Sequence, residues 1–150
     1  MPTMNWHCTP WPELNTTALY DILALRAAVF VVEQACAYLD LDGLDREALH
    51  VYAYDANGSL KACARILPAG IAFPEASIGR VCVALSERRN GLGKELMRRT
   101  LAQVQAHYGD VPLRISAQQY LLRFYESFGF RQVSETYLED GIPHVEMWRG

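Results

Sequence analysis

The chain has 150 residues, of which 51% are hydrophobic and 21% are charged, and its formal net charge is −3. This length suits one domain over residues 1–150, and such a chain has no overall electrostatic attraction to nucleic acid or to an anionic membrane. The N-terminus lacks the apolar core of a signal peptide, and no stretch approaches the roughly 20 apolar residues of a membrane span. The four cysteines show no C-x-x-C spacing, which predicts reduced thiols in a cytoplasmic protein rather than a disulfide framework or a zinc site.

The first third of the chain predicts a strand, a helix and an acidic loop. Residues 4–9 read as a strand, and Asn15 can cap a helix whose apolar residues recur at helical spacing as far as Phe30. The following loop contains the sequence D-L-D-G-L-D at 40–45, whose glycine position does not fit a calcium-binding loop. Two interpretations of this acidic segment remain open: a solvated turn, or an acidic rim that attracts a cationic substrate.

The middle of the chain predicts a hairpin and then a strand followed by a helix. Residues 49–55 and 60–67 flank Asn57-Gly58, which is a strong signal for a β-hairpin. Residues 76–85 follow as a strand, and residues 92–108 have the apolar periodicity of an amphipathic helix. The predicted buried stripe of this helix consists of Leu92, Leu96, Met97, Thr100, Leu101 and Val104.

The turn between this strand and helix is suited to bind a phosphate. Gly91 and Gly93 leave the first N–H groups of the helix accessible, and these groups carry partial positive charge. The turn is not a Walker loop, because Arg88 replaces its first glycine, and it is not a dinucleotide fingerprint, because Leu96 replaces the third glycine. We predict a pyrophosphate cradle here, and the plainer interpretation is a helix start with two permissive glycines. The predicted cradle residues are Arg88, Arg89, Asn90, Gly91, Leu92, Gly93 and Lys94.

The last third of the chain predicts a strand, a short helix and a second hairpin. Residues 112–117 alternate as a strand, and residues 120–128 read as a short helix. Residues 130–137 and 142–148 flank Asp140-Gly141, a second hairpin signal. The order of elements therefore predicts a mixed α+β (α/β) fold with about seven strands.

Five stretches in order along nearly the whole chain resemble one family. R-x-x-G-x-G at 88–93 and F-Y-E-S-F-G-F at 124–130 resemble two motifs of the GNAT family of N-acetyltransferases. V-F-V-V-E-Q at 29–34, D-L-D-G-L-D at 40–45 and E-D-G-I-P-H at 139–144 are similar to its ElaA-type subfamily. The resemblance implies the GNAT fold, in which a central and largely antiparallel sheet splays between two parallel strands. It also implies that an amine attacks acetyl-CoA, the co-substrate, directly, without an acyl-enzyme or a metal.

The resemblance assigns roles to residues on the co-substrate side. The backbone of Val81, Cys82 and Val83 would hold the pantetheine arm, and an N–H near Cys82 or Val83 would polarise the thioester carbonyl. Tyr125 would protonate the departing CoA thiolate, with a packing role as the alternative, and Gln118 would contact CoA. We do not favour Cys82 as a nucleophile, because it lies within a strand and no histidine is near it in sequence.

Three residues are predicted on the acceptor side. Glu33 ends the apolar run that contains Phe30, and its carboxylate could take a proton from the acceptor amine. The alternative for Glu33 is a helix-end glutamate in water, or one fixed by Arg26 or Arg65. His144 is predicted either to contact the acceptor or to be a surface or hairpin histidine whose hydrogen bonds are satisfied.

Two alternative functions stay open beside N-acetyl transfer. The chain could be a non-catalytic acyl-CoA-binding GNAT domain, or a transferase that uses a longer acyl-CoA. The expected partner is a small-molecule or peptide amine, with no nucleic acid and no membrane, and a homodimer is compatible with the sequence. His7, His50 and His107 share no spacing with the other histidine, so the sequence does not support a metal site.

Overall fold

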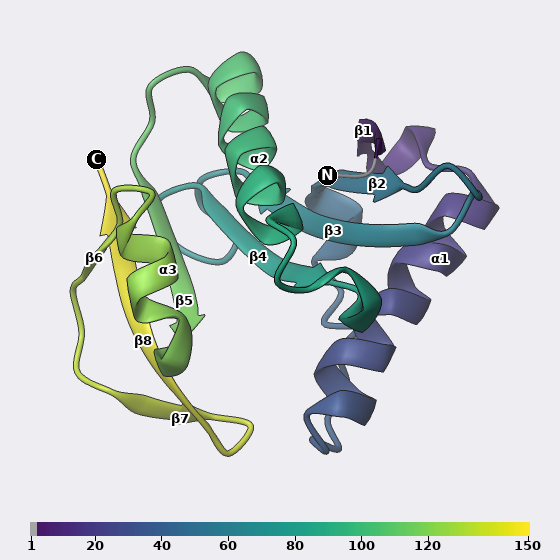
Figure 1. Cartoon of the computed structure of the whole chain (residues 1–150). Helices are drawn as coiled ribbons and strands as arrows, with labels where there is room; N and C mark the ends of the chain where they lie inside the picture. Colours follow the sequence, from purple (N-terminus) through teal and green to yellow (C-terminus); the bar gives the residue numbers. More distant parts are fainter. Residues whose placement is uncertain (1–2) are drawn as a thin grey trace.

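The structure is a computed structural model that describes residues 3–150, and these residues form eight strands and three α-helices (Figure 1). The strands are β1 Asn5–Pro10, β2 Leu49–Tyr54, β3 Leu60–Leu67, β4 Ser77–Val83, β5 Leu113–Gln118, β6 Arg131–Gln132, β7 Tyr137–Glu139 and β8 Ile142–Arg149. The helices are α1 Thr16–Arg26, α2 Leu92–Tyr108 and α3 Leu122–Glu126, and a π-helical segment, Ala27–Glu33, continues α1. Of the described helices, none combines the length and the apolar character needed to cross a membrane.

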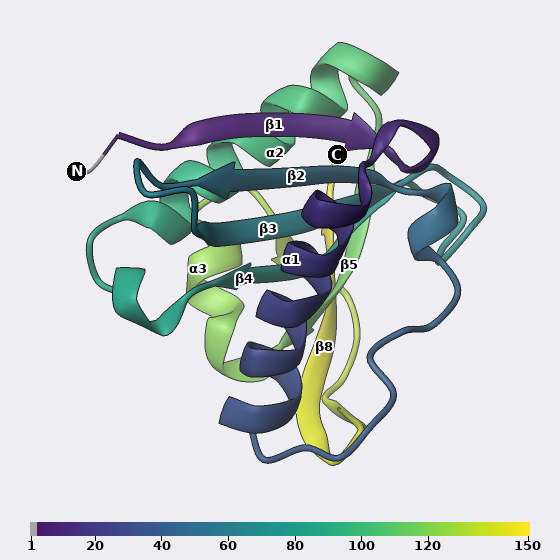
Figure 2. The same cartoon turned by 90° about the vertical axis from the view of Figure 1, so that its right-hand side faces the viewer.

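The strands form two antiparallel sheets that meet at one point. The first sheet has the order β1-β2-β3-β4, and the second has the order β5-β8-β6, with β7 also paired to β8. A single parallel bridge between Ala76 and Leu113 joins them, and beyond it β4 and β5 diverge (Figures 1 and 2). The largely antiparallel sheet that splays between two parallel strands, which the resemblance implied, is therefore present.

The helices cover both faces of the first sheet. Figure 2 shows α1 in front of strands β2, β3 and β4, with α2 behind them. The predicted stripe of α2 is confirmed, because Leu92, Leu96 and Met97 are fully buried in the main core. On the α1 face, Ile22 and Val29 pack with Tyr52 in a second, smaller core. Burial on both faces fixes β4, the strand from which the cleft is built.

Several predicted boundaries were wrong. The first helix changes to π-helical geometry after Arg26, so the apolar run up to Glu33 is itself helical. The predicted strand at 130–137 is broken into β6 and β7, and only the two ends pair with β8. The predicted helix at 120–128 begins as a 3₁₀ turn, Gln119–Leu121, and its α-helical part is shorter than expected.

The acidic segment at 40–45 is neither a solvated turn nor a free acidic rim. Asp40 and Asp45 are 8% and 6% exposed. Arg26 of α1, which is 1% exposed, donates to Asp40 Oδ2 at 2.8 Å and to Asp45 Oδ1 at 2.7 Å. Both earlier interpretations are wrong because buried guanidinium groups neutralise these carboxylates.

Two further arginines complete this buried ion-pair network. Arg65 of β3 binds Asp42 with both of its terminal nitrogens, at 2.8 Å and 2.5 Å. Arg80 of β4 forms an ion pair with Asp40, in which its Nε lies 2.7 Å from Oδ1, and its Nη2 donates to the backbone carbonyl of Asp40 at 3.0 Å. The acidic segment is thereby fastened across α1, β3 and β4 rather than free to bind a ligand.

Candidate active site

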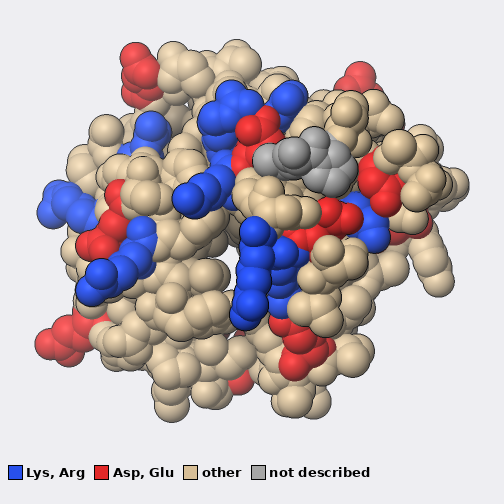
Figure 3. Space-filling model, viewed as in Figure 1, with Lys and Arg blue, Asp and Glu red and all other residues tan. Residues whose placement is uncertain are grey.

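A cavity of about 490 Å³ lies where β4 and β5 diverge. Figure 3 shows this face of the molecule hollowed at its centre, with Lys and Arg atoms along the rim. The volume lies within the range of roughly 300–1,000 Å³ that is usual for ligand sites. Its walls come from the π-helical segment, β4, the turn after β4, β5, α3 and the β7–β8 hairpin. The predicted residues that line it are Phe30, Glu33, Val81, Cys82, Val83, Arg88, Arg89, Gly93, Gln118, Tyr125 and His144.

The helix start at this cavity carries no side-chain cap. Gly91 is the N-cap of α2 and has φ +87°, a left-handed conformation that favours glycine. By contrast, α1 is capped by Asn15, whose side chain accepts a hydrogen bond from the Ala18 N–H at 2.7 Å. The Leu92 N–H lies 3.4 Å from Asn90 Oδ1, and the other N–H groups of the first turn of α2 are left for another acceptor, for which an anion is well suited.

Gly93 gives independent support for a close ligand. A Cβ at this position would meet only Phe124 and Val83 side-chain atoms, each at 4.0 Å, which is ordinary contact. Internal packing and backbone conformation therefore do not require glycine at this site, whereas a ligand that approaches the backbone would.

Not all of the predicted cradle residues face the cavity. The Leu92 side chain is fully buried in the main core, so only its backbone could meet a ligand. Asn90 donates to Glu87 at 2.9 Å, and neither Asn90 nor Gly91 nor Lys94 lines the cavity wall. The part of the cradle that faces the cavity is formed by Arg88, Arg89 and Gly93.

Arg88 connects the two sides of the cleft. It forms a two-pronged ion pair with Glu33, in which Nη1 contacts Oε2 and Nη2 lies 2.7 Å from Oε1. It also donates to the Val83 carbonyl at 3.1 Å and 3.3 Å. The expected partners of Glu33, Arg26 and Arg65, were wrong, since both bind the acidic segment instead. The hydrogen bond from Arg88 lowers the pKa of Glu33.

A β-bulge shapes the strand that borders the cleft. The β3–β4 register shifts between Cys63 and Arg65, and Arg80 in β4 has φ +52°. Sequence offered no signal for this bulge. Among the described residues, the edge of β4 that faces β5 is joined to it only by the bridge at Ala76. Within the described chain, the backbone of residues 81–83 therefore has no strand partner on that edge, although Arg88 already binds the Val83 carbonyl.

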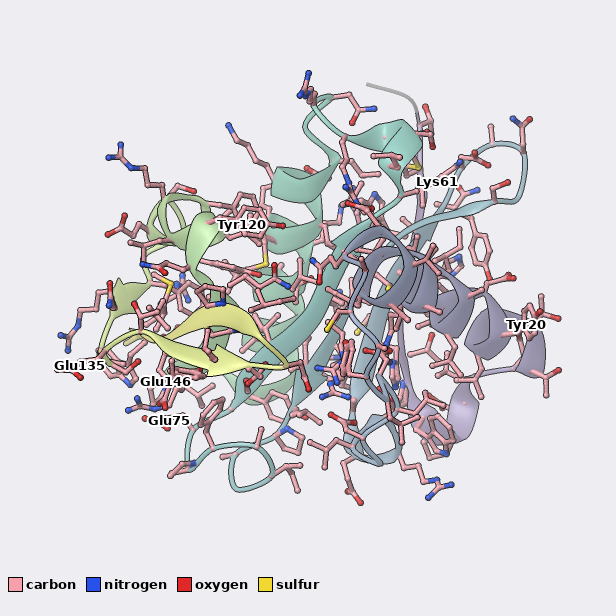
Figure 4. All side chains as sticks on the ribbon, turned by 90° about the horizontal axis from the view of Figure 1, so that it is seen from below. Tyr20, Lys61, Glu75, Tyr120, Glu135 and Glu146 are labelled. Atoms are coloured by element: carbon pink, nitrogen blue, oxygen red, sulfur yellow. The ribbon has the colours of Figure 1, made fainter. Side chains whose placement is uncertain are left out.

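Tyr125 is placed at the floor of the cavity. It is 7% exposed, and its ring packs edge-on against Phe124 and Phe130 at centroid distances of 5.2 Å and 6.0 Å. Burial raises the pKa of Tyr125 above its ordinary value, so the hydroxyl keeps its proton at neutral pH. Tyr120, which was not predicted as a site residue, lies beside α3 in Figure 4; it also lines the cavity and is 74% exposed.

Cys82 is a buried thiol beside a second one. Its Sγ lies 3.5 Å from Sγ of Cys63, its partner across the β3–β4 ladder. The hydrogen bond with Cys63, together with burial, raises the pKa of the Cys82 thiol. Such a thiol is a poor nucleophile, which agrees with the prediction from sequence.

The acceptor side of the cavity is polar. Gln118 faces Gln34 at 3.3 Å across the cleft, so its amide contacts the end of the π-helical segment. His144 stands opposite Gln118 in the β5–β8 ladder and is 6% exposed, so it is not a surface histidine. Sequence reasoning missed Glu139 next to it, although E-D-G-I-P-H had already been singled out. Among residues 3–150, no group of three or more His, Cys, Asp and Glu side chains is arranged to hold a metal ion.

Comparison with known proteins identifies the family. A family model described as an acetyltransferase (GNAT) domain matches residues 25–149. The chain belongs to the GNAT acetyltransferase family. The protein ElaA of Escherichia coli is 43% identical over 148 residues, which cover 97% of this chain and 96% of ElaA. The resemblance to the ElaA-type subfamily is thus confirmed.

Solved structures of GNAT proteins share the whole fold. The crystal structure of E. coli ElaA has a TM-score of 0.92 and covers 99% of this chain and 100% of its own. An acyl-CoA N-acyltransferase from Pseudomonas aeruginosa has a TM-score of 0.93, 39% identity, and coverage of 99% and 100%. A GNAT fold is also seen in an aminoglycoside 6′-N-acetyltransferase complexed with coenzyme A, at 16% identity, a TM-score of 0.69, and coverage of 95% and 96%. Membership of this GNAT family supports acyl transfer as the chemistry of the cleft.

Proposed function

We propose that this GNAT protein transfers an acetyl group from acetyl-CoA to a primary amine, by direct attack of the amine in a ternary complex. One observation carries the proposal: the uncapped start of α2 and the unpaired edge of β4 open into the same cavity. The first can hold a pyrophosphate and the second can pair with the amide groups of a pantetheine arm. The coenzyme A bound to the aminoglycoside acetyltransferase of the same fold is consistent with this arrangement.

The geometry supports the roles that the resemblance gives to residues on the co-substrate side. The N–H groups at the start of α2, with Arg88 and Arg89, would bind the pyrophosphate, and the free space at Gly93 lets it approach. The backbone at Cys82 and Val83 would orient the thioester and polarise its carbonyl. Tyr125, which holds its proton at neutral pH, would donate it to the departing thiolate.

The deprotonation of the acceptor is assigned to Glu33 by the sequence, and this stays a prediction. The structure adds a consideration against it, because Arg88 occupies both of its carboxylate oxygens. The lowered pKa also makes Glu33 a weaker base than an unpaired glutamate. Glu33 could act on an acceptor only after Arg88 moves away from it.

The two alternative functions are separable from this proposal. A non-catalytic domain needs the cradle but not a proton donor, and the placement of Tyr125 in the cavity wall favours catalysis. A longer acyl chain would have to fit the same cavity, whose volume does not discriminate between the acyl groups. We propose a cytoplasmic location for this reaction, which the four free cysteines favour.

Calorimetry of acetyl-CoA binding tests the cradle. Gly93→Val should weaken binding by at least about tenfold, since the new side chain fills the space that the phosphate needs. Ala102→Val is the matched control, because it puts the same β-branched residue at an exposed site of the same helix and should leave binding unchanged. If the two variants bind acetyl-CoA with equal affinity, the start of α2 does not hold the pyrophosphate. A panel of primary amines, scored by release of the CoA thiol, then tests transfer.

A further inference from the structure

We propose that His144 is the general base that deprotonates the acceptor, and that Glu139 holds the acceptor's ammonium group beside it. The acceptor is then a primary aliphatic amine that binds in its protonated form. This inference rests on the proposed function and deepens it. It assigns the role of base to His144 in the β7–β8 hairpin instead of Glu33 in the π-helical segment.

His144 is buried but reaches the cavity. It lies on β8, where its neighbour Val145 points the opposite way, into the main core. Its cross-strand partner Gln118 shares its face of the sheet and contacts Gln34 on the far side of the cleft. His144 therefore stands on the acceptor side of the cavity, whose lining also contains Tyr125.

The hydrogen bonds of the ring determine which nitrogen is free. Nδ1 lies 2.6 Å from the carbonyl oxygen of Ile142. A carbonyl can only accept, so Nδ1 carries a hydrogen and donates it. The neutral ring then presents the lone pair of Nε2, the atom that a base needs.

In the neutral ring, Nε2 carries no hydrogen and faces a carboxylate. It lies 3.4 Å from Oε2 of Glu139. A neutral Nε2 and an ionised carboxylate are both acceptors, so the pair is satisfied only by a proton or by a donor bound between them. An ammonium group has three N–H donors on one positive centre, which allows it to serve both atoms at once.

The two acceptors are held in place by their neighbours. Ser116 donates to Oε1 of Glu139 at 3.3 Å and lies 2.5 Å from the hydroxyl of Tyr137. The ring of Tyr137 stacks on His144 at a centroid distance of 6.1 Å and an angle of 26°. The opposite rim is close as well, since Cys36 contacts the Asp140 carbonyl at 3.4 Å. Glu139 and Tyr137, both on β7, are the titratable groups that these contacts place against the imidazole.

Among the described residues, Glu139 and its neighbour Asp140 line the cavity without an arginine or lysine partner, unlike Glu33. The two oxygens of Glu33 are both bound to Arg88, and Asp40 is bound to Arg26 and Arg80. The Glu139 side chain is 49% exposed, so an amine arriving from solvent can reach it. A cationic acceptor would be attracted to this carboxylate in preference to the neutralised ones.

The proton balance of the step is complete. Nε2 of His144 takes one proton from the ammonium, and the resulting imidazolium is stabilised by Glu139. The amine nitrogen forms a C–N bond to the thioester carbon, and the C–S bond breaks. Tyr125 donates its proton to the sulfur, and the second proton of the nitrogen passes through water to Tyr125 as the amide forms. The imidazolium releases its proton to solvent, so that ammonium and acetyl-CoA give an N-acetyl amine, the CoA thiol and one proton.

Chemical rescue tests the base directly. His144→Ala should lose about 10²–10⁴-fold in turnover of an aliphatic amine, the range of general base catalysis. Added imidazole should restore turnover in proportion to its concentration, because it can enter the space that the ring left. The probes are 1,4-diaminobutane, ethanolamine and a lysine-containing peptide, whichever the wild-type protein acetylates. His107→Ala, an exposed histidine of α2, is the matched control and should lose nothing and gain nothing from imidazole.

Two further variants keep the test decisive. His144→Asn retains a donor for the Ile142 carbonyl, preserves the hairpin and should lose turnover as His144→Ala does. Glu139→Gln should raise the KM for the amine more than it lowers kcat. Wild-type turnover in a folded His144→Asn variant, or a loss in His144→Ala that imidazole never restores, overturns the assignment. If none of the aliphatic probes is acetylated while acetyl-CoA still binds, the proposed class of acceptor is wrong, whereas the proposed pyrophosphate site is not contradicted.

Discussion

Replacing Tyr125 by phenylalanine removes one hydroxyl and leaves the packing of the ring unchanged. The ring contacts with Phe124 and Phe130 are made by carbon atoms, so the fold should persist. The free energy of unfolding should change by no more than about 1 kcal/mol, the usual contribution of one hydrogen-bonding group. A loss of turnover in this variant can therefore be assigned to the hydroxyl.

The size of the loss follows from the acidity of the two groups. A free phenol has a pKa of about 10 and a thiol about 8.5, so full proton transfer is uphill by about 2 kcal/mol even before burial. Because burial raises the pKa of Tyr125 further, its main contribution is a hydrogen bond to the developing thiolate. Hydrogen bonds to charged groups contribute about 1.5–3 kcal/mol. We therefore expect turnover to fall by about 10- to 150-fold, which reaches only the lower end of the ~10²–10⁴-fold range for general acids.

The assay is a single-turnover measurement, in which acetyl-CoA is bound first and the amine is then added at saturation. Release of the CoA thiol reports the bond that Tyr125 acts on, and product release does not mask it. Calorimetry on the same variant should show unchanged affinity for acetyl-CoA. Full turnover of Tyr125→Phe under these conditions would return Tyr125 to a packing role.

Three other predictions follow from the ion pairs and caps. Burial raises the pKa of Asp42, but hydrogen bonds from Arg65 outweigh burial and hold the pKa well below its ordinary value. The ionised Asp42 side chain therefore stabilises the fold above the unfolded pKa of about 3.9, and this stabilisation is lost as pH falls below that value. Denaturant midpoints should accordingly differ most between wild type and Asp42→Asn near neutral pH and converge in acid. Asn15→Ala should lower the free energy of unfolding by about 1 kcal/mol in the same assay. Glu33→Gln should change acetyl-CoA affinity by at most about fivefold in calorimetry, because exposed pairs such as that with Arg88 contribute up to about 1 kcal/mol; a hundredfold loss would mean that this pair is required for binding.

Local patterns in the sequence predicted the parts of the site that depend on neighbouring residues. The helix start at Gly91, the stripe of α2 and the hairpin at Asn57-Gly58 each follow from a few adjacent residues, and the structure has all three. The family resemblance brought together residues that spacing alone could not, such as Val81 and Tyr125, which line one cavity.

Contacts between distant segments could not be predicted in this way. Arg88 and Glu33 are 55 residues apart, and Arg26 lies in α1 whereas Asp40 lies in the loop after the π-helical segment. Charged residues in a loop normally face water, so composition favoured a solvated turn where buried arginines neutralise the acidic segment. The position of Glu139 against His144 likewise depends on how the β7–β8 hairpin folds back on itself.

The reaction itself is the central claim, and one measurement tests it most directly. Wild-type protein is incubated with acetyl-CoA and each amine of the panel, and the mass of the amine and the amount of free CoA thiol are measured in the same sample. The account predicts at least one primary amine that gains a single acetyl group, with one thiol released for each amine acetylated. Tight binding of acetyl-CoA with no acetylated amine and no thiol release across the panel would contradict the claim and favour a non-catalytic acyl-CoA-binding domain.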